Sequence, residues 1–131
     1  MSRKTIDDLL AEARAGLRRV GPQEARDAAA GGALLIDIRS DNQRAQDGVV
    51  PEAIHFPRNV LEWRCDPASE GYDARVGRRF DRTLIVMCNE GYQSSLAAAV
   101  LQEIGFPNAT DLDGGFQAWR AAGLPVEPLG G

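Results

Sequence analysis

Short apolar runs alternate with stretches of helical spacing along most of the chain. Two apolar runs, over residues 33–38 and 84–88, predict buried strands, and residues 53–56 and 109–112 predict two further short strands. A helix is predicted over 5–17, where apolar residues recur at helical spacing, and a second from Pro22, a favoured first residue, to the Gly31-Gly32 pair. Two more are predicted over 94–104 and 116–122, each ended by a glycine. Strands that alternate with helices in this way predict an α/β fold with a mainly parallel sheet.

Three further segments carry weaker signals. Residues 58–80 are polar and irregular, apart from a predicted helical turn at 60–63. Pro and Gly are frequent from 125 to 131, and we expect this tail to fray. The first helix carries an apolar stripe from Ile6 to Leu17, which either packs on the domain or forms a dimer surface. Packing is the favoured interpretation.

Composition excludes several classes of protein. The 131 residues are 44% hydrophobic, which suits one domain with one ordinary core. The net charge is −4, so the basic surplus of a nucleic-acid binder is missing. No apolar run approaches the roughly 20 residues of a membrane span. The N-terminus turns acidic at Asp7-Asp8 instead of entering an apolar signal region, and we expect a cytoplasmic protein with no membrane partner.

The chain is poor in metal ligands. It has two cysteines, Cys65 and Cys88, no CxxC pattern, and one histidine, His55. A zinc site needs about four nitrogen or sulfur ligands, or three and a water. We therefore expect no metal and no cofactor, and a cytosolic setting favours free thiols over a disulfide.

Cys88 stands where a strand gives way to a helix. The apolar run at 84–88 ends on Cys88, a loop with one glycine, Gly91, follows, and we expect Ser94 to cap the next helix. A helix N-terminus and a ring of backbone N–H groups favour a thiolate or a negatively charged terminal sulfur. The alternative is a small buried hydrophobe at a strand end.

Four segments, in the same order, resemble the rhodanese-like domain, a sulfurtransferase module. They are Asp37-Ile38-Arg39, residues 48–57, the loop from Cys88 to Ser94, and residues 114–119 with 123–126. The resemblance spans about residues 20–127. It implies a parallel five-stranded sheet flanked by helices. Residues 1–18 then form an N-terminal helical extension, 19–127 the rhodanese-like domain, and 128–131 a flexible tail.

The resemblance also implies a function for the loop. Cys88 would accept a sulfane sulfur as a persulfide and pass it to a thiol or to cyanide. The loop around it would bind substrate through Asn89, Glu90, Gly91, Tyr92, Gln93 and Ser94. The implied partners are a small sulfur donor, either a persulfide or thiosulfate, and a thiol acceptor that could be a protein. The alternative is a weakly active or inactive binding or regulatory module of the same fold.

The loop departs from the family pattern in its charges. Many thiosulfate-active rhodaneses carry arginine where this chain has Asn89 or Gln93, and Glu90 adds a negative charge. Thiosulfate is a dianion, so we expect weak thiosulfate activity and favour a thiol or protein persulfide as donor. Phosphatases of the C-x5-R type share the fold and need an arginine where this chain has Ser94. Phosphate or arsenate chemistry is therefore disfavoured.

Other residues are assigned mainly supporting roles. Asp37 and Arg39 are expected to form an ion pair that holds the loop, in preference to direct substrate contact. Arg58, Trp63 and Arg64 are candidates for the pocket rim, and a solvated face explains them equally well. His55 is expected to be structural and Trp119 part of the core. Cys65 is expected to be filler or a surface cysteine in preference to a resolving thiol.

Overall fold

The computed structural model describes residues 2–130, so Met1 of the predicted extension and Gly131 of the predicted tail lie outside the described residues. Helices and strands alternate along the chain, as predicted. In order they are α1 (Ile6–Ala15), α2 (Pro22–Ala30), β1 (Leu34–Asp37), α3 (Asp41–Asp47), β2 (Ile54–His55), the 3-10 turn η1 (Arg58–Val60), α4 (Leu61–Cys65), β3 (Leu84–Met87), α5 (Gln93–Glu103), β4 (Thr110–Asp111) and α6 (Gly115–Ala121).

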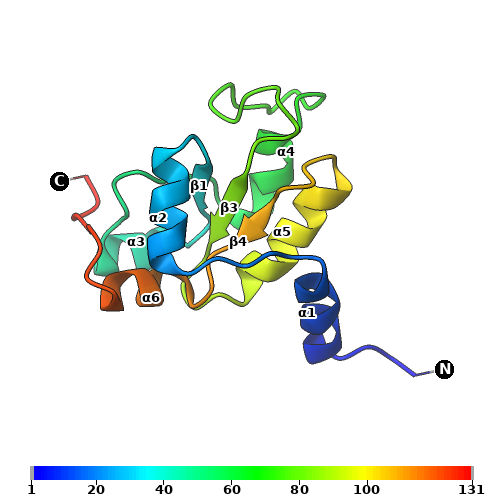
Figure 1. Ribbon diagram of the computed structural model, residues 1–131, viewed down its shortest axis with the longest axis horizontal. Coiled ribbons are helices and arrows are strands. Elements are labelled where there is room, and N and C mark those ends of the chain that lie inside the picture. The colour runs from blue at the N-terminus through cyan, green and yellow to red at the C-terminus, as the bar shows by residue number, and fades with distance from the viewer. Residues whose placement is uncertain (1, 131) are drawn as a thin grey trace.

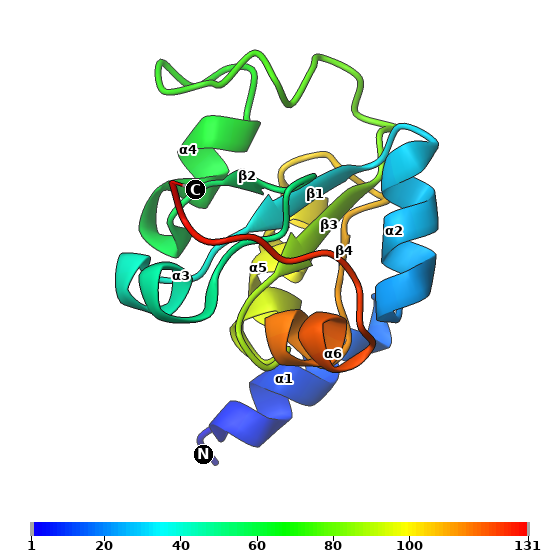
Figure 2. The same ribbon diagram turned by 90° about the vertical axis from the view of Figure 1, so that its left-hand side faces the viewer.

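The strands form one parallel sheet in the order β2-β1-β3-β4. Leu34 of β1 pairs with Leu84 of β3, which sets the register of the two central strands. Every residue of both strands is buried, because helices cover both faces of the sheet. Figure 1 shows α2 and α6 on one face and α4 and α5 on the other. Figure 2 shows the parallel strands between them.

Alternating side chains of the strands fill two separate cores. Leu35, Ile85 and Met87 pack with α2 and α6, where Phe116 and Trp119 are fully buried. The opposite core lies under α4 and α5, and its strand members are Leu34, Ile36, Leu84 and Val86. The prediction that Trp119 belongs to the core is confirmed.

The sheet differs from the five strands expected. Among residues 2–130 it has four strands, and the edge beyond β4 carries only a bridge between Val20 and Leu112. The Val20 N–H donates to the Asp111 carbonyl, and the Val20 carbonyl accepts from the Asp113 N–H. Pro22 begins α2 two residues later, and proline has no N–H to continue the ladder. The fifth strand is therefore reduced to one residue.

Helix α3 was not predicted from the sequence. A capping box between Ser40 and Gln43 begins it, and Gly48 ends it with a positive φ of 90°. Ala45 is its only apolar residue, so the segment has no hydrophobic stripe. The only sequence features that indicate this helix are therefore the capping residues at its start and the glycine at its end.

The tail was expected to fray from residue 125 onward, and for residues 125–127 this expectation is wrong. Backbone N–H groups of Val49 and Glu127 each donate to the other residue's carbonyl, at 2.8 and 2.9 Å. The Trp119 indole N–H donates to the Pro125 carbonyl at 2.9 Å. These bonds hold residues 125–127 on the domain despite their composition.

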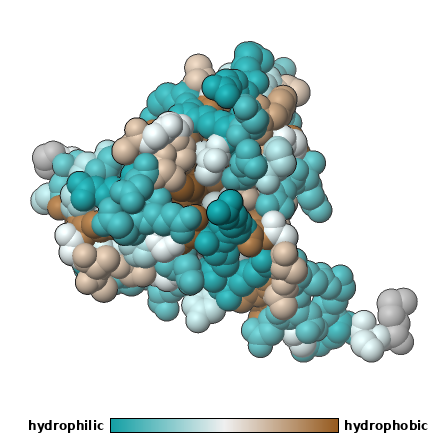
Figure 3. Space-filling view, in the orientation of Figure 1, coloured by the Kyte–Doolittle hydropathy of each residue, from teal (hydrophilic) through white to brown (hydrophobic). Residues whose placement is uncertain are grey.

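Helix α1 lies beside α5 and projects from the body of the domain (Figure 1). The apolar stripe packs only in part: Leu17 contacts the core, whereas Ile6 and Leu9 are 63% and 42% exposed. The face seen in Figure 3 is mostly hydrophilic, with apolar residues in small areas. No helix within residues 2–130 has the length and apolar character to cross a membrane.

Candidate active site

Cys88 follows the last residue of β3, and its sulfur faces the start of α5. The residue is 8% exposed. The Gly91 N–H donates to Cys88 Sγ at 3.1 Å and the Ser94 N–H at 3.4 Å. Two backbone amides of the loop therefore contact the sulfur. Such N–H groups favour negative charge on a sulfur atom.

The loop has this shape because of Gly91. Its φ is +90°, a conformation that other residues rarely adopt. A Cβ at this position would lie 2.8 Å from the Gly114 nitrogen, so a side chain would also collide with the start of α6. The Phe116 N–H of α6 donates to the Cys88 carbonyl at 2.8 Å. Helix α6 therefore supports the loop directly.

The prediction that Ser94 caps α5 is wrong. The N-cap residue is Tyr92, and its side chain makes no capping bond. The hydroxyls of Ser94 and Ser95 instead donate to Asp111 Oδ2, each at 2.8 Å. Asp111 is fully buried at the end of β4, and a buried carboxylate needs such donors. The serines therefore join α5 to the sheet.

Arg19 pairs with the same carboxylate. Its Nε lies 2.9 Å from Asp111 Oδ1, and its Nη2 donates to the Gly91 carbonyl at 2.9 Å. Burial opposes its charge, but the hydrogen bond to Asp111 and attraction to Asp111, Asp113 and Cys88 raise the pKa of Arg19. A permanent positive charge therefore stands near the sulfur, although the loop itself contains none.

Arg14 of α1 is a second cation at the loop. Its Nη2 donates to the Gly91 carbonyl at 2.8 Å, and its Nε donates to Ser95 Oγ at 3.0 Å. Its guanidinium also lies 5.6 Å from the centre of the Tyr92 ring. Sequence reasoning missed Arg14 and Arg19, because both lie before the segments that resemble the family and no local pattern marks them.

A cavity of about 330 Å³ opens at Cys88. Four of the loop residues proposed to bind substrate line it, namely Asn89, Glu90, Tyr92 and Gln93, together with Ile38, Arg39, Ser40 and Gln43. Gly91 and Ser94 reach the sulfur through their N–H groups instead. Glu90 is exposed at the cavity, so its negative charge faces both the cavity and solvent.

The expected ion pair between Asp37 and Arg39 is present. The Arg39 Nη2 lies 2.9 Å from Asp37 Oδ2, and both side chains are buried. The guanidinium also covers the Phe116 ring at 3.8 Å, so the pair braces the helix that supports the loop. His55 bonds the Arg39 carbonyl through Nε2 at 2.9 Å, as expected of a structural histidine.

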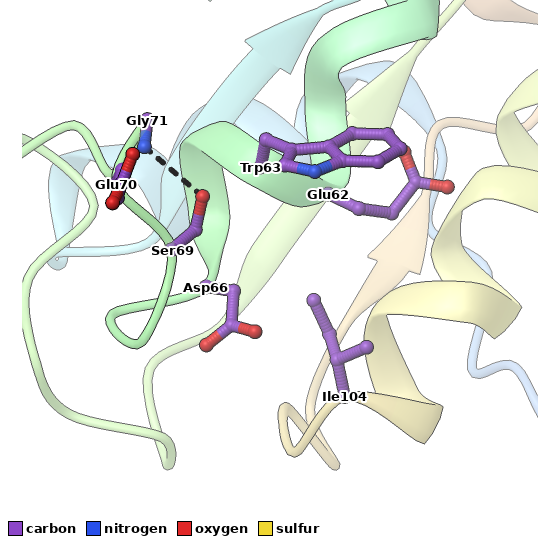
Figure 4. A pocket seen from close by; sticks show the side chains of 7 residues that line it. All are labelled: Glu62, Trp63, Asp66, Ser69, Glu70, Gly71 and Ile104. Atoms are coloured by element: carbon purple, nitrogen blue, oxygen red, sulfur yellow. Dashed lines mark hydrogen bonds between the residues drawn. The ribbon is translucent and has the colours of Figure 1, made fainter.

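The three candidate rim residues are in different places. Arg58 reaches the loop, where its Nε donates to Gln93 Oε1 at 3.0 Å. Trp63 lines a separate cavity of about 480 Å³ with Ile104, beyond the far end of α5 (Figure 4). The Arg64 Nη1 donates to the Gly71 carbonyl. Neither Trp63 nor Arg64 lines the cavity at Cys88.

Cys65 is buried filler and not a surface cysteine. It is fully enclosed in the core under α4 and α5, and both cysteines are free thiols. Burial, together with the carboxylates of Glu62 and Asp73, raises the pKa of Cys65 to about 12. Within residues 2–130, no three His, Cys, Asp or Glu side chains are grouped to hold a metal ion.

The family model of the rhodanese-like domain matches residues 21–122. The chain belongs to this family. A thiosulfate sulfurtransferase GlpE of Pseudomonas savastanoi pv. phaseolicola is 32% identical over 114 residues, which cover 87% of this chain and 96% of the relative. GlpE of Vibrio cholerae serotype O1 is 46% identical over 95 residues, which cover 72% and 79%. These rhodanese relatives support a sulfurtransferase activity.

Solved structures share the rhodanese-like fold. A Rhodopseudomonas palustris protein of unknown function, described as a possible tyrosine phosphatase, has a TM-score of 0.87 and 28% identity, over 97% of both chains. That coverage extends into the N-terminal extension. A polysulfide-sulfur transferase homodimer from Wolinella succinogenes has a TM-score of 0.73 and 24% identity, over 91% of this chain and 84% of that one, and it supports the fold alone.

Proposed function

We propose that Cys88 carries a sulfane sulfur as a persulfide. The Cys88 thiolate attacks the outer sulfur of a donor persulfide, R–S–SH. A sulfur–sulfur bond forms to Cys88, the sulfur–sulfur bond of the donor breaks, and the donor leaves as a thiolate. No separate general base is required, because the thiolate is itself the nucleophile.

The second half-reaction returns the enzyme to its starting state. An acceptor thiolate attacks the outer sulfur of the Cys88 persulfide, and Cys88 leaves as a thiolate. The acceptor gains one sulfur and becomes a persulfide, and cyanide in the same role becomes thiocyanate. Sulfur changes carrier twice, and no external oxidant or reductant is consumed.

One observation supports this proposal most strongly. The N–H groups of Gly91 and Ser94 both point at Cys88 Sγ, at 3.1 and 3.4 Å. A buried structural cysteine needs no such donors, whereas a thiolate or persulfide anion is stabilised by them. The names of the sulfurtransferase relatives support the same reaction class.

We infer a thiol persulfide or a protein persulfide as donor, with thiosulfate a slow substitute. Glu90 lines the cavity and opposes a dianion, and the loop offers no positive side chain in return. A neutral or singly charged persulfide meets less repulsion. A thiol acceptor and a cytoplasmic location belong to the same proposal, as does the assignment of the lining loop residues to substrate binding.

A phosphatase is the second candidate, since one structural relative is described as a possible tyrosine phosphatase. The position that needs an arginine in C-x5-R enzymes is Ser94, whose hydroxyl donates to Asp111. A serine there supplies no bidentate cation for a phosphate. We therefore expect p-nitrophenyl phosphate hydrolysis no faster than that of a Cys88→Ser variant.

Mass spectrometry tests the proposal directly. After incubation with glutathione persulfide, a mass gain of one sulfur atom should appear on the peptide that contains Cys88. Cys65→Ser should keep the gain, and Cys88→Ser should lose it. No gain with glutathione persulfide, cysteine persulfide or thiosulfate would refute the carrier proposal and favour a non-catalytic binding module.

A further inference from the structure

The carbonyl of Gly91 accepts hydrogen bonds from two guanidinium groups. Arg14 Nη2 is 2.8 Å away and Arg19 Nη2 is 2.9 Å away. Both arginines precede residue 21, where the family match begins. The N-terminal extension therefore contacts the loop at the residue whose own N–H lies 3.1 Å from Cys88 Sγ.

These bonds restrict the most adjustable residue of the loop. Glycine has the widest choice of backbone angles, and Gly91 is already at a φ of +90°. Fixing its carbonyl fixes the Gly91–Tyr92 peptide plane, whose N–H points opposite to its carbonyl in the trans form. This peptide lies between the two N–H groups that contact the sulfur, those of Gly91 and Ser94, so the arginines limit how far the loop that carries both donors can turn away.

Arg14 also brings a charge that no carboxylate offsets. Arg19 lies against Asp111 and Asp113, at 2.9 and 3.3 Å. Arg14 forms no salt bridge with any carboxylate of residues 2–130, and its partners are the Gly91 carbonyl, the Ser95 hydroxyl and the Tyr92 ring. Because the loop has no cation of its own, Arg14 supplies uncompensated positive charge beside it.

We propose that Arg14 is a positioning residue for the sulfur-carrying loop and that α1 is consequently part of the active site. The proposal rests on the function proposed above for Cys88. Arg14 acts through Gly91 and does not contact the sulfur. Its charge lies at Gly91 and not in the cavity, so it does not replace, as a substrate contact, the arginine that is absent at Asn89 and Gln93.

Alkylation of Cys88 tests the proposal without requiring sulfur transfer. The rate of iodoacetamide modification is measured across pH in a Cys65→Ser background, with Arg14→Gln against the matched control Arg18→Gln. Arg18 lies in the same segment and is exposed, and its side chain makes no hydrogen bond or salt bridge within residues 2–130. Arg14→Gln should slow alkylation about threefold to tenfold at neutral pH and recover at alkaline pH. Arg18→Gln should match the parent.

Arg14→Lys separates charge from geometry. Lysine keeps the charge but lacks the planar fork that reaches Gly91 and Ser95 together, so its alkylation profile should lie between those of the parent and Arg14→Gln. Circular dichroism should show all variants folded, since α1 has no buried residue. If Arg14→Gln does not fold, the test rests on Arg14→Lys alone. An alkylation profile of Arg14→Lys equal to that of the parent would then refute the proposal.

The results separate this proposal from the one it rests on. Equal pH profiles for Arg14→Gln and Arg18→Gln would overturn the role of Arg14, whether or not Cys88 takes up sulfur. Failure of the parent protein to form a persulfide would overturn the carrier proposal, even with a shifted profile in Arg14→Gln. Support for both requires a persulfide on the parent and a shift confined to the Arg14 variants.

Discussion

Amide hydrogens, and not charged side chains of its own loop, contact the sulfur of Cys88. The Gly91 and Ser94 N–H groups are backbone donors, so their presence does not depend on the neighbouring side chains. Asn89, Glu90 and Gln93 line the cavity at Cys88. Substitutions at these three residues should therefore change donor preference more than the ability to hold a sulfur.

Reversing the charge at Glu90 should raise thiosulfate activity. Two unit charges about 4 Å apart in water interact by about 1 kcal/mol, and a dianion doubles this energy. Reversing the charge would therefore change this energy by about 4 kcal/mol at that distance. Because Glu90 is exposed, solvent and salt screen most of it, and we expect Glu90→Arg to increase kcat/KM for thiosulfate by about tenfold, mostly through KM. Steady-state thiocyanate formation with cyanide as acceptor measures it.

Glu90→Gln is the matched control, because it removes the negative charge without adding a positive one. It should give a smaller increase than Glu90→Arg. Activity with glutathione persulfide should change less than activity with thiosulfate in both variants. A fall in thiosulfate turnover with Glu90→Arg would show that the charge at this position does not limit donor choice.

Cys65 should make stability depend on alkaline pH. Its pKa is raised to about 12 by burial, above the value of about 8.5 in an unfolded chain. A thiol whose pKa is raised by folding contributes its full stabilisation at pH values below its pKa in the unfolded chain. This stabilisation is lost as the pH rises toward its pKa in the folded protein. Above about pH 9, the free energy of unfolding should fall more steeply in the parent than in Cys65→Ala, by up to about 1.4 kcal/mol per pH unit.

Urea titrations in the presence of a reducing agent measure this difference. Both chains contain the same tyrosines, lysine and arginines. The difference between their slopes of unfolding free energy against pH is therefore due to the ionisation of Cys65. Parallel slopes would show that Cys65 ionises without cost in the folded protein. In the folded parent at neutral pH, iodoacetamide should modify Cys88 and leave Cys65 intact.

Asp111 joins three elements around the active site. It lies at the end of β4 and accepts hydrogen bonds from Ser94 and Ser95 of α5 and from Arg19 of the N-terminal segment. Asp111→Ala removes the buried acceptor of two serine hydroxyls and leaves Arg19 with only Asp113 and the Gly91 carbonyl. We expect a loss of about 3–5 kcal/mol in the free energy of unfolding, as for other broken buried pairs.

Asp113→Ala is the control for the charge. Asp113 also faces Arg19, at 3.3 Å, but its side chain is 67% exposed. Its removal should cost less than about 1 kcal/mol. Chemical denaturation measures the free energy of unfolding of both variants. Similar decreases in both would contradict the expectation that the buried Asp111–Arg19 pair stabilises the protein more than the exposed Asp113–Arg19 pair.

Some elements could be predicted from local patterns and others could not. The strand that precedes Cys88 is a continuous apolar run, and the helix after it, α5, follows a run of small and apolar residues, so both were expected. Helix α3 has no such stripe and was missed. Ser94 looks like a helix cap in sequence, but a buried carboxylate 17 positions away binds its hydroxyl. Only the fold reveals that competitor.

The same distinction applies to the molecule as a whole. The position of Cys88 and the Asp37–Arg39 pair could be predicted, because each depends on a strand end. The contacts of Arg14 and Arg19 with Gly91 span 77 and 72 positions in the chain, and nothing in either segment indicates the other. The N-terminal extension therefore looked separate in sequence, although in the folded chain Arg14 contacts the loop that follows Cys88.

Transfer of a single sulfur from the loaded protein tests the central claim most directly. The chain is incubated with glutathione persulfide, freed of donor by gel filtration and mixed with cyanide. We predict about one thiocyanate per chain, with the mass returning to that of the unmodified protein, and none from Cys88→Ser. Thiocyanate from Cys88→Ser, or a loaded parent that releases none, would contradict the assignment of Cys88 as the sulfur carrier.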